Sequence, residues 1–191
     1  MGRPGGETIL QVSRIRITGG AWRSRLIRVE DAPGLRPTPD RVRETLFNWL
    51  GQDLAGLDCL DLFAGTGILG FEAASRDAAS VTLVERDQGA LAGLRKNAAA
   101  LDGERLVVVR ADALEFAASA VGRGSRFDLV FVDPPYRLGW LDRLWPHLPA
   151  LIAPDGRLYV EAEAPIEPPA PWAVAKQGRA GQVCYQLLER E

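Results

Sequence analysis

The sequence contains little cysteine and no long apolar run. Its two cysteines, Cys59 and Cys184, lie far apart in a chain of 191 residues, without the spacing of metal ligands. We therefore expect both to be reduced core residues, and we expect no metal site. No stretch approaches the roughly 20 apolar residues that a membrane span requires. The first residues also lack the apolar segment of a signal peptide. These absences predict a cytoplasmic protein with no membrane partner.

The chain has no large excess of charge of either sign, but its charge is unevenly distributed. The formal net charge is −2. Residues 1–50 contain nine arginines and five acidic residues, a net charge of +4, so the remaining residues carry −6. Eight of these arginines lie between Arg14 and Arg43. A basic segment joined to an acidic body is typical of a surface that faces a polyanion. A solvated arginine-rich face would have the same composition.

The basic segment has the pattern of a hairpin followed by a helix. Arginine and isoleucine alternate in the first part of residues 12–29, which contain a glycine pair at 19–20, so two strands with one cationic face are expected. A helix should follow, with Thr38 as its N-cap, Pro39 in its first position and an end at Gly51. The chain is thus divided into a flexible terminus at 1–11, a basic extension at 12–51 and a main domain at 52–191.

The main domain alternates short apolar runs with helical segments. Buried strands are predicted at 59–63, 81–84, 106–109, 129–132 and 158–160. Helices are predicted at 68–77, 88–101, 112–121 and 138–145. This alternation is typical of an α/β fold with a parallel, doubly wound sheet. The tail differs, because residues 172–176 and 183–188 flank a glycine turn and predict an antiparallel hairpin at the edge.

A glycine-rich turn follows the first of these strands. Gly65, Gly67 and Gly70 have the spacing of a nucleotide-binding loop, in which the backbone can pass close to a ligand. Glu85 ends the second strand, 20 residues beyond Gly65, where a carboxylate can accept hydrogen bonds from ribose hydroxyls. This fingerprint alone fits a nicotinamide dinucleotide about as well as S-adenosylmethionine.

Two further acids favour S-adenosylmethionine. Asp61 stands four residues before the first glycine, where its carboxylate can receive the amino group of a methionine moiety. Asp112 follows the third strand, at the same edge of the sheet, and can meet an adenine amine. The three acids describe a ligand with an amino-acid end, a ribose and a base. The other residues expected to bind the cofactor are neighbours of these glycines and acids: Phe63, Ala64, Thr66, Arg86, Ala113 and Asp133.

The most specific motif is Asp133-Pro134-Pro135-Tyr136, directly after the fourth strand. An exocyclic amine of a nucleobase is a poor nucleophile, since its lone pair is delocalised into the ring. Its attack on a sulfonium methyl requires acceptors that hold the N–H bonds. Asp133 supplies a carboxylate, and the proline pair can present the carbonyl of Pro134 rigidly. Tyr136 offers a flat face for a base removed from its stack, an interaction worth roughly 1–3 kcal/mol.

These segments together resemble the RsmD family, the small-subunit rRNA guanine-N2 methyltransferases. The resemblance covers the chain from about Arg14 to its end. The matching segments are Arg16–Arg23, Leu35–Leu50, Asp61–Gly67, Asp133–Tyr136 and Gly181–Tyr185. The second, LRPTPDRVRETLFNWL, is long and unusual. Tyr136 stands where the family often has phenylalanine, a change that retains the stacking face.

The resemblance implies a fold, a reaction and a substrate. The fold is a Rossmann-like class I methyltransferase, with a mostly parallel seven-stranded sheet, a C-terminal antiparallel hairpin and a small N-terminal extension of a hairpin and a helix. The reaction is the S-adenosylmethionine-dependent methylation of N2 of guanine 966 of 16S rRNA, in an assembling 30S subunit. Separately from the resemblance, we expect a monomer. The extension would contact RNA phosphates. The arginines expected there are Arg14, Arg16, Arg23 and Arg25 on the hairpin and Arg36, Arg41 and Arg43 at the start of the helix. The helix start, with Thr38, could close over either the target phosphate or the carboxylate of the cofactor.

Three alternatives are compatible with parts of the sequence. A nicotinamide-dependent oxidoreductase would explain the glycine spacing and Glu85 but not the motif at Asp133. A non-catalytic RNA-binding module would explain the arginines but not the intact glycine loop. A methyltransferase acting on adenine N6, or on another nucleobase amine of RNA or DNA, would use the same motif. The roles of Trp22 and Trp140, in base stacking or in packing, also stay open.

Overall fold

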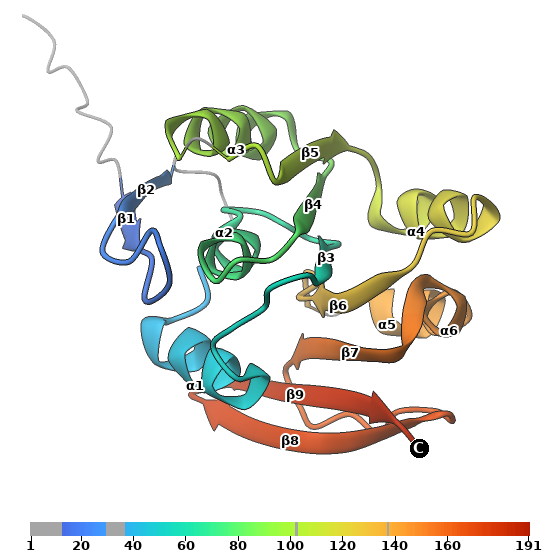
Figure 1. The fold of residues 1–191 in the computed structure, drawn as a ribbon. Coiled ribbons are helices and arrows are strands. Elements are labelled where there is room, and N and C mark those ends of the chain that lie inside the picture. The colour runs from blue at the N-terminus through green and yellow to red at the C-terminus, as the bar shows by residue number, and fades with distance from the viewer. Residues whose placement is uncertain (1–12, 30–36, 102, 137) are drawn as a thin grey trace, which may run out of the picture.

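A computed structural model describes residues 13–29, 37–101, 103–136 and 138–191, and its centre is a seven-stranded sheet (Figure 1). The strand order is β5-β4-β3-β6-β7-β9-β8. The strands are β3 (Asp58–Asp61), β4 (Ser80–Glu85), β5 (Leu106–Arg110), β6 (Phe127–Val132), β7 (Ile152–Ala162), β8 (Trp172–Ala180) and β9 (Val183–Arg190). Strands β3 to β7 are parallel, and β9 runs antiparallel to β7 and β8. The predicted fold class is confirmed.

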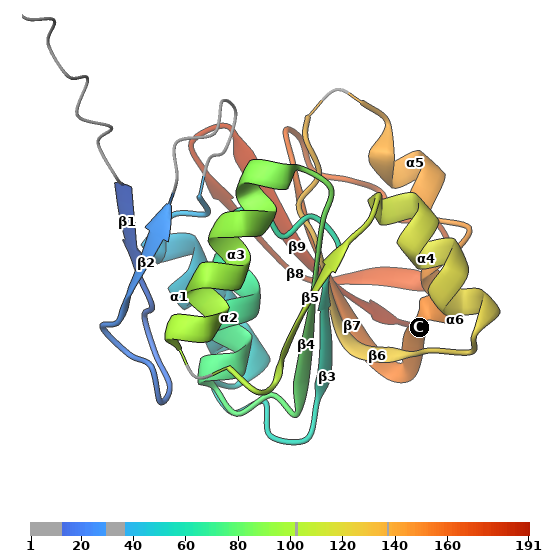
Figure 2. The same ribbon diagram turned by 90° about the horizontal axis from the view of Figure 1, so that it is seen from above.

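Helices cover both faces of the sheet (Figure 2). One face carries α1 (Asp40–Leu50), α2 (Ile68–Ser75) and α3 (Gln88–Ala100), and the other carries α4 (Ala113–Gly122), α5 (Trp140–Leu144) and α6 (Leu148–Leu151). The alternation of β6 explains this arrangement: Leu129 and Phe131 belong to the core with α1 to α3, whereas Val130 and Val132 belong to the core with α4 to α6. None of the helices in the described ranges is long and apolar enough to cross a bilayer.

The basic segment forms the expected hairpin, outside the layer of α2 and α3 (Figure 2). Strands β1 (Ser13–Arg16) and β2 (Leu26–Val29) pair antiparallel. Gly20 in the connection has a φ of +76°, and a Cβ there would lie 1.8 Å from the carbonyl oxygen of Ser75. Only glycine permits this approach, so the connection is fixed against the end of α2. The terminus expected to be flexible, residues 1–11, lies outside the described residues.

Two local predictions were wrong at the ends of elements. Pro39, not Thr38, occupies the N-cap position of α1, and no side chain caps the helix. The Thr38 hydroxyl instead donates to Oε1 of Glu161 at 3.1 Å, a partner that is distant in the sequence. The helix predicted at 138–145 begins at Trp140, and the short α6 and the early start of β7 were not predicted.

Both cysteines are buried and unpaired, in agreement with their predicted place in the core. Burial raises the pKa of the Cys59 thiol to about 12, and the nearby carboxylate of Asp128 acts in the same direction. The thiol is therefore protonated at neutral pH, as is typical of a structural cysteine.

Candidate functional site

The candidate site lies at the carboxyl edge of the sheet, between β3 and β6. These two strands are parallel neighbours, with Asp61 paired with Phe131. The chain continues from β3 to β4 on one side and from β6 to β7 on the other. In open α/β sheets, ligands bind in the crevice outside such a topological switch point. Asp61 ends β3 and Asp133 follows β6, so both predicted carboxylates lie at this point.

The glycine loop connects β3 to α2 with a tight backbone path. Gly67 is the N-cap of α2 in the left-handed conformation, with a φ of +79°. A Cβ at this position would lie 2.4 Å from Leu94 and 2.7 Å from Phe71. The turn therefore requires glycine both for its conformation and for the packing of α3 on α2. Gly65, with a φ of +51°, donates its N–H to Oε2 of Glu85 at 2.9 Å.

The predicted ribose and adenine ligands are near this loop. Besides Gly65, the Glu85 carboxylate accepts hydrogen bonds from the N–H groups of Arg86 and Asp87, so its position is fixed by three backbone donors. Asp112 is the N-cap of α4 and accepts from Leu114 at 2.9 Å through Oδ1. Its Oδ2 lies 3.7 Å from the Arg86 guanidinium. Each carboxylate thus keeps lone pairs that face away from its backbone donors.

An aromatic pair lies beside these residues. Trp140 is 6% exposed and contacts Phe63 edge to face, with ring centroids 5.2 Å apart. The guanidinium groups of Arg86 and Arg143 lie 5.6 Å and 4.8 Å from the Trp140 ring centroid. The buried Nε1–H of Trp140 has no hydrogen-bond partner among the described residues. Buried indole N–H groups usually have one, so this donor marks a place where a polar ligand atom fits.

Burial and mutual repulsion shift the pKa values of the acids in the crevice. Burial raises the pKa of Asp61 to about 7, and the charges of Glu85 and Glu161 act in the same direction. Burial also raises the pKa of Asp133 well above its ordinary value, with Glu161 and Asp61 as repelling neighbours. Neither Asp61 nor Asp133 has a salt bridge to a cation in the part of the chain that the structure describes. The crevice is therefore suited to a cationic ligand.

The motif after β6 presents one carboxylate that is uncommitted, in the sense that no described residue donates a hydrogen bond to it. Asp133 is half-buried and accepts no hydrogen bond from the residues that the structure describes. Pro134 is buried, Pro135 is exposed, and Tyr136 is half-buried in the turn that follows. A half-buried carboxylate without a donor can accept the N–H of an incoming amine without first losing a partner.

The basic hairpin presents its arginines to solvent. Arg14 and Arg16 are exposed while Ile15 is buried, so the predicted cationic face is present. Arg14 is paired with Arg28 across the hairpin. Like charges directly opposite each other destabilise a sheet, and a polyanion on this face would relieve the repulsion. Arg23 on the connection is also exposed, as are Arg25 and Arg41. Arg36 lies outside the described residues.

Arg43 does not belong to this surface, contrary to the sequence-based prediction. Its side chain is 1% exposed and forms ion pairs with Asp40 at 2.9 Å and with Glu72 at 3.0 Å. Its two terminal nitrogens also donate to the carbonyl oxygens of Thr38 and Arg16. All its donor nitrogens are engaged inside the protein, so Arg43 supports the fold and is unavailable to RNA.

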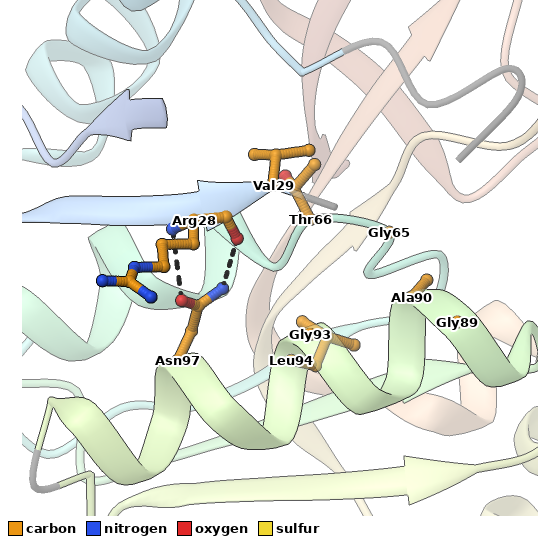
Figure 3. A pocket seen from close by; sticks show the side chains of 9 residues that line it. All are labelled: Arg28, Val29, Gly65, Thr66, Gly89, Ala90, Gly93, Leu94 and Asn97. Carbon is orange, nitrogen blue, oxygen red and sulfur yellow. Dashed lines mark hydrogen bonds between the residues drawn. The ribbon is translucent and has the colours of Figure 1, made fainter. Parts of the chain in front are cut away.

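The hairpin is attached to α3 next to the glycine loop (Figure 3). Asn97 accepts from the backbone N–H of Arg28 at 3.2 Å and donates to its carbonyl at 2.8 Å. A small hollow between β2 and α3 is lined by both residues and by Gly65 and Thr66. The basic extension and the glycine loop therefore border the same hollow.

Three features of this region were missed in the sequence. Glu161 is buried at the end of β7 and joins the acids of the crevice. Glu72 is buried between Arg43 and Arg76. Its neighbours on α2 are apolar, and nothing in the sequence of that helix predicts a buried ion pair. Arg28 completes the cationic face, and the alternation of Ile27, Arg28 and Val29 in the sequence indicated it.

The comparisons with known proteins agree with this geometry. The family described as "Conserved hypothetical protein 95" matches residues 15–189. "Ribosomal RNA small subunit methyltransferase D" of Escherichia coli K12 is 45% identical over 183 residues, which cover 93% of this chain and 91% of that protein. Its namesake of Haemophilus influenzae is 39% identical and covers 92% of this chain and 93% of its own length. A solved structure described as a putative methyltransferase from Escherichia coli has a TM-score of 0.81 at 43% identity, over 94% of this chain and 99% of its own. The chain therefore belongs to the RsmD family.

Proposed function

We propose that this chain methylates the exocyclic N2 of a guanine in small-subunit rRNA, with S-adenosylmethionine as the methyl donor. The observation that carries the proposal is the uncommitted carboxylate of Asp133 at the switch point beside the buried Asp61. The names of the relatives support small-subunit rRNA as the substrate. The family resemblance supports guanine 966 in an assembling 30S subunit. Residues 12–51 would then form the RNA-binding extension and residues 52–191 the methyltransferase domain.

The residues of the crevice fit the cofactor. When bound, S-adenosylmethionine supplies an electrophilic methyl group on a sulfonium. Asp61 is a buried carboxylate without a cationic partner among the described residues, and it would accept the ammonium group. Glu85 would accept the ribose hydroxyls, and Asp112 would accept the adenine amine, with Phe63 and Trp140 as an aromatic wall beside it.

Asp133, Pro134 and Tyr136 would orient the nucleophile. The Asp133 carboxylate and the Pro134 carbonyl accept the two N–H bonds of the amine, which turns its lone pair toward the methyl group. Tyr136 stacks on the extruded base. The cofactor would supply the methyl group and retain the electron pair of its S–C bond, and Asp133 would accept the N–H proton that the methylated nitrogen releases and pass it to solvent. The rate acceleration comes from orientation and preorganised acceptors.

Mass spectrometry tests the proposed reaction. Purified protein, radiolabelled S-adenosylmethionine and 30S particles isolated from cells without this enzyme should give N2-methylguanosine in the digested rRNA. The formation of N6-methyladenosine instead would favour the alternative substrate. The absence of any transfer, together with tight binding of NAD and none of S-adenosylhomocysteine, would point to the oxidoreductase.

The affinity for S-adenosylhomocysteine should rise with pH below neutrality. The proposed ammonium site needs an ionised Asp61, whose pKa of about 7 keeps it largely protonated at pH 6. Binding at pH 6 must therefore expel a proton, and the Kd should fall about five- to tenfold between pH 6 and pH 7.5. Isothermal titration calorimetry in two buffers of different ionisation enthalpy measures both the Kd and the proton release.

Asp61→Asn is the control for this pH dependence. The amide cannot titrate, so the variant should bind more weakly and with a Kd that is nearly constant from pH 6 to pH 7.5. A wild-type Kd that does not change over this range would remove Asp61 from the ammonium site. The range stops at pH 7.5 because the amino group of the ligand itself titrates near 8.

Substitution of Arg14, Arg16 and Arg23 together by Gln should weaken RNA binding and its salt dependence. The three side chains are exposed on the hairpin, and each phosphate contact contributes about 0.7–0.9 to the slope of log K against log salt. The slope should therefore become shallower by up to about 2–3 for the three side chains together. Filter binding of rRNA between 50 and 300 mM salt measures it.

A matched triple variant, Arg123→Gln, Arg126→Gln and Arg179→Gln, removes the same charge from exposed positions outside the basic extension. Its salt slope should stay close to that of the wild type. Equal slopes for the wild type and both variants would assign the hairpin arginines to ordinary solvation.

A further inference from the structure

A second carboxylate stands beside Asp133 at the end of the neighbouring strand. In the parallel pair β6 and β7, Val132 is paired with Val160, so Asp133 and Glu161 are the next residues of the two strands. Phe131 is paired with both Asp61 and Tyr159, which places Asp61 and Glu161 on the same face of the sheet. Glu161 is only 3% exposed. The mechanism described above does not use it.

The surroundings of Glu161 hold one of its oxygens and leave the other open. The hydroxyls of Tyr159 and Thr38 both donate to Oε1, at 2.9 Å and 3.1 Å. Oε2 accepts no hydrogen bond from the part of the chain that the structure describes. This oxygen is not occupied by a protein donor, so it can accept an N–H group from a ligand. The protein fixes the orientation of the side chain and leaves one acceptor for something else.

The charge of Glu161 also acts on Asp133. After burial, the charge of Glu161 is the largest cause that raises the pKa of Asp133. The two carboxylates therefore lie close enough to act on one molecule. A ligand that presents two adjacent N–H donors would satisfy both.

Guanine and adenine differ in this respect. The N2 amine of guanine lies next to N1–H, so its edge presents two neighbouring donors. The N6 amine of adenine lies next to N1, which carries a lone pair and no hydrogen. A carboxylate opposite N1 therefore attracts guanine and repels adenine, and enzymes that extrude a base read this edge.

We propose that Glu161 selects guanine, by accepting N1–H through Oε2 while Asp133 accepts the N2 amine. This inference rests on the proposed function and deepens it, because the catalytic motif alone serves both bases. A site built to bond an N–H group rejects an analogue that lacks it, because its buried acceptor is left unpaired. We expect a preference of at least about 10²-fold in kcat/KM.

The test uses 2-aminopurine, which keeps the 2-amine but has a lone pair at N1. Small-subunit rRNA is ligated from two pieces so that the guanine methylated by the wild type is replaced by 2-aminopurine. The wild type should prefer guanine by at least about 10²-fold in kcat/KM. In Glu161→Gln, the hydroxyls of Tyr159 and Thr38 hold the amide oxygen, so the amide NH₂ faces the base and donates to N1. The preference should fall at least about tenfold and can reverse.

A structural role for Glu161 predicts a different result. Glutamine still accepts both hydroxyls, so a residue that only anchors Thr38 would change the rates with both bases by the same factor. An unchanged ratio would thus overturn the proposal, and so would a wild type that methylates both bases equally well. The second outcome needs no variant. A wild type that methylates no guanine at N2 would contradict the proposed function, which is a separate failure.

Two further variants complete the experiment. Tyr159→Phe removes one supporting hydroxyl but keeps the carboxylate, so it should lower the rates and retain most of the preference for guanine. Glu189→Gln changes the same group at an exposed position of β9 and should leave both rates unchanged. Binding of S-adenosylhomocysteine and thermal unfolding show that each variant is folded. If Glu161→Gln is unfolded, Glu161→Asp replaces it, and its withdrawn carboxylate should also reduce the preference.

Discussion

Asp133→Ala should lower kcat for methyl transfer by at least about 10²–10³-fold, which is the usual cost of losing one preorganised group that stabilises the transition state. The Asp133 carboxylate follows β6 at the switch point and has no donor among the residues described, so its lone pairs are available to the substrate amine. Without it, the amine keeps its planar, delocalised form. The proposed transfer then depends on the Pro134 carbonyl and on stacking alone.

The loss should appear in kcat and much less in cofactor binding. Asp133 lies among acids that include Asp61, and the ammonium would keep its partner in the variant. The Kd for S-adenosylhomocysteine should therefore change by less than about threefold. Single-turnover kinetics with 30S particles and calorimetry separate the two effects. Turnover within a few fold of the wild type would remove Asp133 from the mechanism.

Asp155→Ala is the matched control, since it removes an exposed carboxylate near the start of β7, at the opposite end of the strand from Glu161. It should retain the turnover of the wild type. Asp133→Asn gives an intermediate test, because the amide oxygen can still accept one N–H while the charge is lost. Its kcat should lie between those of the wild type and Asp133→Ala.

The fold was predictable because its signals are local in the sequence. Each apolar run of the parallel sheet is short and is separated from the next by a helical segment or a glycine turn, and the strands are found where the runs are. The alternation of Arg14, Ile15 and Arg16 likewise predicts the first strand of the hairpin, since only one face of that strand is buried. Such patterns depend on periodicity and not on distant partners.

The errors concern side chains whose partners are distant in the sequence. Thr38 has the pattern of an N-cap, but its hydroxyl bonds Glu161, 123 residues away. In the sequence, Arg43 has the pattern of an exposed arginine on a basic helix, but in the structure it is buried in an ion pair with Glu72. A charge flanked by apolar residues is compatible with exposure or with a buried ion pair, and the sequence does not identify the partner. The place of Glu161 in the crevice was not predicted for the same reason.

Glu72→Ala should lower the free energy of unfolding by about 3–5 kcal/mol, because it leaves the buried guanidinium of Arg76 without its counter-ion and that of Arg43 with only the half-exposed Asp40. Glu72 is 0% exposed and lies between Arg43 and Arg76, whose side chains are 1% and 2% exposed. It also accepts from the backbone N–H and the hydroxyl of Thr18, at 2.8 Å and 2.9 Å. The network thus joins the hairpin to α1 and α2. Urea unfolding at pH 7, followed by circular dichroism, measures the loss.

The expected loss of stability in Glu72→Ala comes from leaving a buried charge unpaired. It does not measure the net stabilisation that the ion pair provides. A triple variant in which Arg43 and Arg76 become Met and Glu72 becomes Leu removes all three charges together, and it should recover part of the stability lost in Glu72→Ala. Glu44→Ala on the exposed side of α1 changes the net charge equally and should cost less than about 0.5 kcal/mol. If Glu72→Ala were as stable as Glu44→Ala, the network would not hold the hairpin against the domain. Thr38, which follows the hairpin and whose carbonyl accepts from Arg43, would then need another support for its bond to Glu161.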